Sequence, residues 1–74
     1  MSKLPQISGK DLVKALGKIG YEKDWQRGSH IILRLNISPF RRVTIPNHKE
    51  IAKGTLRAIV KQVGLTVDEL INLL

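Results

Sequence analysis

Apolar residues recur at helical spacing near the start of the chain, between Ser8 and Gly20. Ser8 suits the N-cap position, with Asp11 three residues further on, and a glycine such as Gly20 is a common helix stop. The apolar positions of this segment are Leu12, Val13, Leu16 and Ile19. Because residues three and four apart lie on one helix face, the pattern predicts a first amphipathic helix.

The same spacing returns in the last third of the chain. It predicts a second helix from about residue 54 or 55 to residue 63, with Gly64 as its C-terminal stop. Its apolar stripe consists of Leu56, Ile59, Val60 and Val63. Thr66 and Glu69 form a capping-box pattern before a short third helix. The apolar face of that helix, formed by Val67, Leu70, Ile71 and Leu74, is suited to docking or to dimerisation.

Between the long helices, alternation replaces helical spacing, which is typical of strands. It predicts strands at 21–26, 30–35 and 42–45, with a turn at 27–29 and a loop at 36–39. Val43 and Ile45 are expected to face inward, and Pro46 to end the third strand because it donates no ladder hydrogen bond. The predicted sheet is therefore an antiparallel meander.

The middle strand presents two different faces. Ile31, Leu33 and Leu35 share one face, whereas His30, Ile32 and Arg34 share the other. The second face carries two polar groups, so we expect it to be the more open one.

A length of 74 residues is enough for one compact domain, expected over residues 1–74. Helix, three strands, helix and short helix form an α+β layer architecture. The chain has no cysteine, which excludes disulfides. We expect a cytoplasmic protein, because Met1 to Pro5 lack the apolar stretch of a signal peptide and no segment is long enough to cross a bilayer. A helix-turn-helix DNA binder is disfavoured because predicted strands separate the long helices.

Charge narrows the class of ligand. Thirteen Lys and Arg against six Asp and Glu give a formal net charge of +7, which predicts a polyanion. Two ridges of cations with four-residue spacing lie on the helices: Lys10, Lys14 and Lys18 on the first, and Lys53, Arg57 and Lys61 on the second. Lys53 and Arg57 lie near the positive end of a helix dipole, which favours a phosphate nearby. Solvated helix faces would explain the same ridges, so both interpretations stay open.

The run Gly28-Ser29-His30 places an imidazole directly after a tight turn, where it can meet a substrate. A histidine can donate or accept a proton during phosphodiester cleavage, and RNA supplies its own nucleophile in the 2′-hydroxyl, which DNA lacks. Positive charge at the phosphate can come from Arg27, Arg34, Lys53 or Arg57. The alternative is that His30 only completes the strand.

Four other features give weaker signals. His48 precedes a helix and can orient a phosphate, although a solvated loop histidine is the commoner outcome. Trp25 can stack on a base or pack within the sheet. Ser29 adjoins His30, but adjacent strand residues point to opposite faces, so we expect it to form the turn rather than to act as a nucleophile. Two separated histidines and no cysteine give little support to a metal site, and no cofactor is expected.

Three segments taken together resemble the HicA toxin family, also called YcfA-like: Gly28-Ser29-His30, the strand at 42–46 and the helical block at 53–65. The resemblance covers nearly the whole chain. It implies a double-stranded-RNA-binding-domain-like fold, an mRNA interferase activity that blocks translation, and neutralisation by a HicB antitoxin. It places the family's catalytic histidine at His30. Trp25 and the loop through Pro39 and Phe40 are less typical of the family.

These observations lead to one main hypothesis and two alternatives. We expect a metal-independent endoribonuclease, the toxin of a type II toxin–antitoxin system, in which His30 is the general acid or base. The expected RNA surface is the sheet with one helix edge, through Arg27, Ser29, Arg34, Lys10, Lys14, Lys53, Arg57 and Lys61. A HicB-like antitoxin is expected to cover His30. The alternatives are a non-catalytic double-stranded-RNA-binding module and an adaptor whose basic surface binds an acidic protein.

Overall fold

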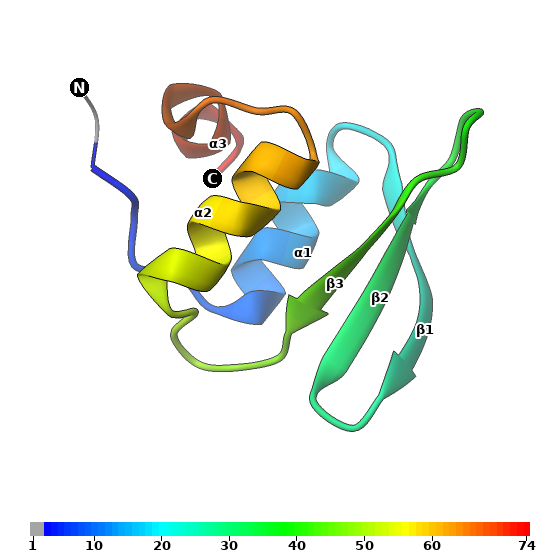
Figure 1. Ribbon diagram of the computed structural model, residues 1–74, viewed down its shortest axis with the longest axis horizontal. Helices are drawn as coiled ribbons and strands as arrows, with labels where there is room; N and C mark the ends of the chain where they lie inside the picture. Colours follow the sequence, from blue (N-terminus) through cyan, green and yellow to red (C-terminus); the bar gives the residue numbers. More distant parts are fainter. Residues whose placement is uncertain (1–2) are drawn as a thin grey trace.

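The computed structural model describes residues 3–74; Met1 and Ser2, which begin the predicted domain and the segment that lacks signal-peptide features, lie outside the described residues. The elements follow in the order α1 (Gly9–Gly17), β1 (Tyr21–Arg27), β2 (His30–Leu35), β3 (Arg42–Pro46), α2 (Lys53–Gln62) and α3 (Val67–Leu73) (Figure 1). This order confirms the predicted α+β class and the double-stranded-RNA-binding-domain-like arrangement.

Side-chain caps set the beginnings of α1 and α3. The Ser8 Oγ accepts a hydrogen bond from the Asp11 N–H at 3.1 Å, as predicted. Thr66 and Glu69 form the predicted capping box, with distances of 3.1 and 2.8 Å. Each of these bonds satisfies an N–H that the first turn of a helix leaves without a partner. The caps fix the residues at which these two short helices begin, and both helices also pack into the core.

Several element boundaries differ from the prediction. The first helix ends at Gly17, with Lys18 as its C-cap, so Ile19 lies beyond it and is 38% exposed. The second helix begins at Lys53, before the predicted residue 54 or 55, and Ala52 takes the N-cap position without a side-chain hydrogen bond. The third strand continues through Pro46. A proline is tolerated there because β3 lies at an edge of the sheet.

The sheet has the strand order β1-β2-β3 and is antiparallel throughout, which confirms the predicted meander. The turn between β1 and β2 consists of two residues, Gly28 and Ser29, rather than the predicted 27–29. A register shift interrupts the β1–β2 ladder between Lys23 and Trp25, so that β1 carries one extra residue there, Asp24. That bulge changes which side chains of β1 share a face.

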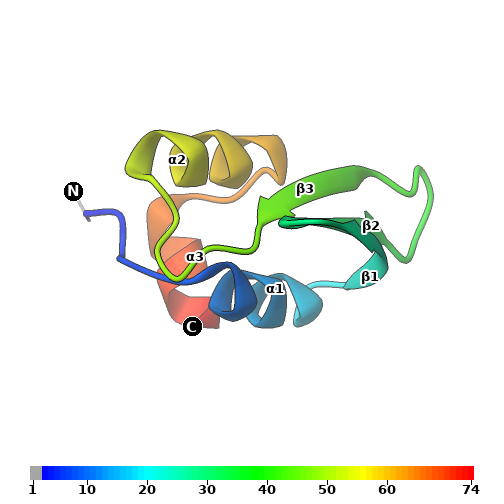
Figure 2. The same ribbon diagram turned by 90° about the horizontal axis from the view of Figure 1, so that it is seen from below.

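The core lies between one face of the sheet and the helices. Leu33, Val43 and Ile45 are at most 2% exposed and belong to the same cluster as residues of all three helices. The helical members include Leu12, Leu16, Leu56, Ile59 and Leu70. Both long helices lie on the same side of the sheet, whereas the β2–β3 loop projects away from both termini (Figures 1 and 2). One face of the sheet is therefore covered, and the other is left open.

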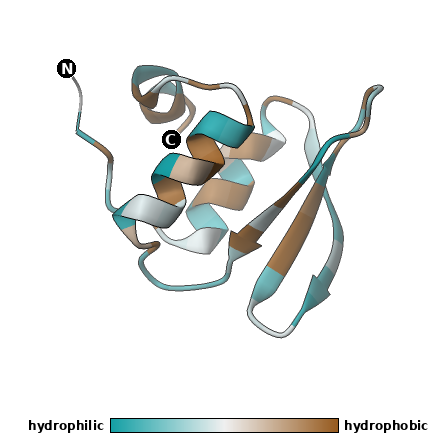
Figure 3. Cartoon of the chain, in the orientation of Figure 1, coloured by the Kyte–Doolittle hydropathy of each residue, from teal (hydrophilic) through white to brown (hydrophobic). Residues whose placement is uncertain are grey.

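Hydropathy along the ribbon follows this division, with apolar residues in β2 and on the helices and hydrophilic residues along most of β1 (Figure 3). Ile32 departs from the prediction: it shares the uncovered face with His30 and Arg34 but is only 9% exposed. The register places Trp25 and Thr44 on either side of it. Side chains directly opposite on neighbouring strands lie close together, so these two flank Ile32 and reduce its contact with water.

Candidate active site on the open face of the sheet

Cross-strand pairing defines the uncovered face, which we call the open face, as three rows of side chains. Directly paired residues point to the same side of a sheet. The row nearest the β1–β2 turn is Arg27, His30 and Pro46; the middle row is Trp25, Ile32 and Thr44; the far row is Glu22, Arg34 and Arg42. His30 therefore stands in the central strand of a largely polar surface, between Arg27 and Pro46.

The turn that presents His30 has a tight backbone conformation and a hydrogen bond to the segment after β3. Gly28 has a φ of +57°, whereas Ser29 has no positive φ, as in a type II′ hairpin turn. The Ser29 carbonyl accepts a hydrogen bond of 2.6 Å from the Asn47 N–H, just after β3. Ser29 thus has the turn-forming role expected from the sequence, and its backbone ties the hairpin to the segment that follows β3.

The His30 side chain is available to a ligand. The residue is exposed, and within residues 3–74 its imidazole has no hydrogen-bond partner. Arg27 faces it directly across the β1–β2 ladder and has no carboxylate partner in the same described part of the chain. Cβ atoms of such a pair are about 4.5–5.5 Å apart. One proton-transfer group and one permanent cation therefore lie side by side.

In the far row, both arginines have partners within the protein. The Arg42 Nε donates to the Asp24 carboxylate at 3.0 Å, so the bulged residue of β1 forms an ion pair with β3. The Arg34 guanidinium lies 5.6 Å from the centroid of the Phe40 ring, in the β2–β3 loop. Phe40 itself has a φ of +56°. Arg42 was not among the predicted site residues, although its alternation with the inward Val43 and Ile45 indicates that it faces the open side.

The predicted basic contacts on the helices line other surfaces. Lys10 lines a shallow groove on the helix-facing side of the sheet, together with Lys23, Gln26 and Ile31. Lys53 and Arg57 line a larger groove of about 760 Å³ with Lys3 and Asp68, where the first turn of α2 has no acidic residue. Lys61 is exposed at the opposite end of α2. The structure does not gather these cations around His30.

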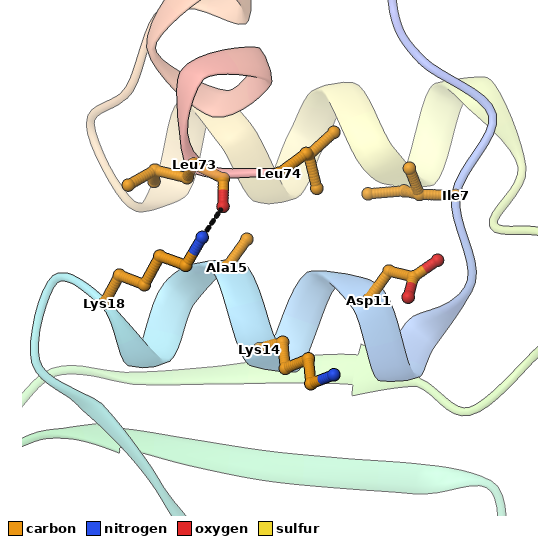
Figure 4. Close-up of a pocket in the computed structure, with 7 residues that line it drawn as sticks. All are labelled: Ile7, Asp11, Lys14, Ala15, Lys18, Leu73 and Leu74. Atoms are coloured by element: carbon orange, nitrogen blue, oxygen red, sulfur yellow. Dashed lines mark hydrogen bonds between the residues drawn. The ribbon is translucent and has the colours of Figure 1, made fainter.

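Lys14 and Lys18 lie at a third surface, between α1 and the end of α3. Lys18 reaches across to the carbonyl of Leu73, with an Nζ–O distance of 2.6 Å (Figure 4). A cation is favourable there because carbonyls at the end of a helix carry partial negative charge. Lys14 and Lys18 both line a cavity between α1 and the end of α3 (Figure 4). The first ridge therefore has at least one member with a structural role.

His48 is exposed in the loop between β3 and α2. Its carbonyl accepts a hydrogen bond of 2.9 Å from the Gly9 N–H at the start of α1. The neighbouring Asn47 is bonded to Ser29, so the loop passes beside the turn that carries His30. A phosphate-orienting role for His48 stays a prediction.

Comparison with known proteins adds to this geometry. A family model for the HicA toxin of bacterial toxin–antitoxin systems matches residues 9–65. The chain belongs to this family. The matched segment runs from the first residue of α1 past the end of α2 and includes the whole open face, whereas α3 lies beyond it. A search of curated proteins gives no match to the chain. Within residues 3–74, no helix is long and apolar enough to span a membrane.

Proposed function

We propose that this HicA-family toxin is an endoribonuclease that cleaves mRNA at the open face, with His30 as general acid or base. One observation carries the proposal: an exposed imidazole in the central strand faces Arg27 at the end of an otherwise uncovered sheet face. Membership of a toxin family and the net charge of +7 support a nucleic-acid target. Such a target would be met in the cytoplasm.

The proposed reaction uses the ribose 2′-hydroxyl of RNA, His30, Arg27 and one further proton-transfer group. The ribose 2′-oxygen attacks the adjacent phosphorus and loses its proton to a base, while the bond from phosphorus to the 5′-oxygen breaks and that oxygen takes up a proton. His30 performs one of these transfers, which typically accelerates a reaction by about 10²–10⁴-fold. The Arg27 guanidinium lies where it can stabilise the negative charge that develops on the phosphate. The other proton transfer is assigned to water, to His48 or to a substrate group.

The test is cleavage of a single-stranded RNA by the purified chain. We expect His30→Ala to abolish cleavage and growth inhibition while leaving the fold intact, and added imidazole to restore part of the cleavage. Asn72→Ala, an exposed polar position on α3, is the matched control and should cleave like the wild type. Undiminished cleavage by His30→Ala would remove this residue from the mechanism. RNA binding without turnover by the wild type would instead support a non-catalytic RNA-binding module.

Metal independence is part of the proposal and has its own test. We expect a chelator to leave cleavage unchanged, and the products to carry a cyclic phosphate at the new 3′ side. Loss of activity that a divalent ion restores, or linear products with a 5′-phosphate, would argue for attack by an external water.

For the antitoxin we propose a HicB-like protein that covers His30 and so excludes RNA. Solvent accessibility of the imidazole in the complex, measured by its rate of chemical modification, checks this directly. We expect strong protection; an imidazole as reactive in the inhibited complex as in the free toxin would require inhibition at another surface.

A further inference from the structure

Trp25 lies on the open face only because of the bulge in β1. Counting alternate residues from the buried Tyr21 would place Lys23 and Trp25 toward the helices. The extra residue Asp24 reverses this parity: Lys23 still pairs with Leu33, but Trp25 pairs with Ile32, whose side chain points away from the core. Bulges often re-aim side chains in this way beside functional sites.

A hydrogen bond on the opposite face supports the reversal independently of the register. Lys23 Nζ donates to Gln26 Oε1 at 2.9 Å, so two residues three positions apart in β1 point to the same side. Both line the groove beside Lys10 of α1, which identifies that side as the helix-facing one. Trp25, adjacent to Gln26, therefore faces the other way, as does Arg27.

The rest of the protein covers only part of the Trp25 side chain. Trp25 flanks Ile32, which is 9% exposed on a face with no helix over it. Trp25 is nevertheless 49% exposed. Half of a large aromatic surface thus remains uncovered in the row next to His30, where diagonal neighbours are about 7–8 Å apart, within reach of long side chains.

We infer that Trp25 is a stacking platform for a nucleobase of single-stranded RNA, beside the phosphate at which His30 transfers a proton; this inference rests on the proposed function. RNA-binding sheets commonly stack bases on exposed aromatic side chains, because every base has a π-face. Charge favours RNA over an apolar protein segment, since Arg27 and His30 form the neighbouring row. The same stack would orient the nucleotide and contribute to the choice of cleavage site.

The first experiment uses Trp25, the only tryptophan of the chain, as its own reporter. A mixed-sequence single-stranded RNA is titrated into the His30→Ala protein, which we expect to bind RNA without cutting it, and indole fluorescence is followed. We expect saturable quenching by the RNA and little change with an abasic ribose-phosphate chain of the same length. Full binding of the RNA with unchanged indole emission would overturn the inference, as would equal responses to both chains.

The second experiment separates stacking from packing, using two substitutions that both keep an apolar cover over Ile32. Trp25→Phe retains a π-face, whereas Trp25→Leu does not. We expect Trp25→Phe to keep RNA affinity near that of the wild type, and Trp25→Leu to weaken it by about 5- to 150-fold, the range that corresponds to base–aromatic stacking. A purely structural role would affect the two variants alike in affinity and in thermal midpoint.

Failure of this inference differs from failure of the proposed function. If the wild type binds RNA with quenching but does not cleave it, the ribonuclease proposal fails and stacking stands. If the wild type cleaves RNA and Trp25→Leu binds and cleaves equally well, stacking fails and the ribonuclease stands. Quenching by an acidic peptide but not by RNA would overturn the inference and indicate a protein-binding surface.

Discussion

Replacing Gly9 by alanine tests how closely the start of α1 is fitted to the segment beside the candidate site. Gly9 is buried, and its N–H donates to the carbonyl of His48 at 2.9 Å. A Cβ on Gly9 would overlap the carbonyl oxygen of Pro46 and lie 3.0 Å from the Cα of Asn47. Pro46 is the residue opposite His30, so the clash falls at the end of β3, next to the turn that carries His30.

The size of the effect follows from two opposing contributions. Alanine in place of glycine in a helix interior raises the free energy of unfolding by about 0.5–1 kcal/mol, and by less at a first position such as Gly9. Overpacking typically lowers the free energy of unfolding by about 1–3 kcal/mol. Here the obstructing atoms are backbone, and Asn47 is held by its hydrogen bond to Ser29, so they cannot rotate away as a side chain would. We therefore expect a net loss of about 1–3 kcal/mol.

Thermal unfolding measures this loss, because each 1 kcal/mol shifts the midpoint by about 4–8 °C in a domain of this size. Gly54→Ala is the matched control: it also lies in a helix, and its Cβ would meet no atom within 4 Å. We expect this control to be neutral or to gain up to about 1 kcal/mol. If Gly9→Ala melted at or above the wild-type midpoint, the close approach of α1 to β3 would be refuted.

Three further predictions concern caps, ion pairs and basic contacts. Thr66→Ala should lower the free energy of unfolding by about 0.5–2 kcal/mol, measured in urea, because it removes the capping box of α3; an unchanged midpoint would contradict this. Asp24→Ala breaks the solvent-exposed pair with Arg42 and should change stability by less than about 1 kcal/mol, so a larger loss would show that the pair holds the bulge. Arg57→Ala should weaken RNA binding and reduce the salt-dependence slope by about 1 if Arg57 contacts a phosphate, whereas an unchanged slope would exclude that contact.

Much of the fold could be predicted because the relevant segments have strong periodicity and clear caps. Leu12, Leu33 and Leu56 were each assigned to a buried face, and each is fully buried. The hydrogen bonds of Ser8 and Thr66 show that the cap signals were correct. In such segments one face is apolar, so a shift of register would expose it to water, and the pattern therefore fixes the structure.

The orientation of Trp25 could not be predicted for the opposite reason. After Tyr21 every residue of β1 is exposed, so no apolar alternation specifies where the strand faces or where an extra residue is inserted. The bulge at Asp24 is visible only in the pairing with β2. His30 was located correctly on the open face because β2 does alternate, whereas no pattern in β1 indicated that Trp25 lies on the same face.

The basic ridges show a similar limit. Four-residue spacing correctly places Lys10 and Lys14 on α1, with Lys18 at its C-cap, but it says nothing about what the helix packs against. Packing of α1 between the sheet and α3 directs Lys18 to the carbonyl of Leu73 and Lys10 to the groove beside β1. Long-range contacts, which no local pattern contains, decide which cations remain free for a ligand.

The most direct test of the account is the single-turnover rate of RNA cleavage by His30→Ala relative to wild type, measured at saturating protein with RNA affinity recorded on the same samples. The account predicts a fall of at least about 100-fold in rate with little change in affinity, because removal of a general acid or base affects the chemical step. A rate within a few-fold of wild type at equal affinity would contradict it.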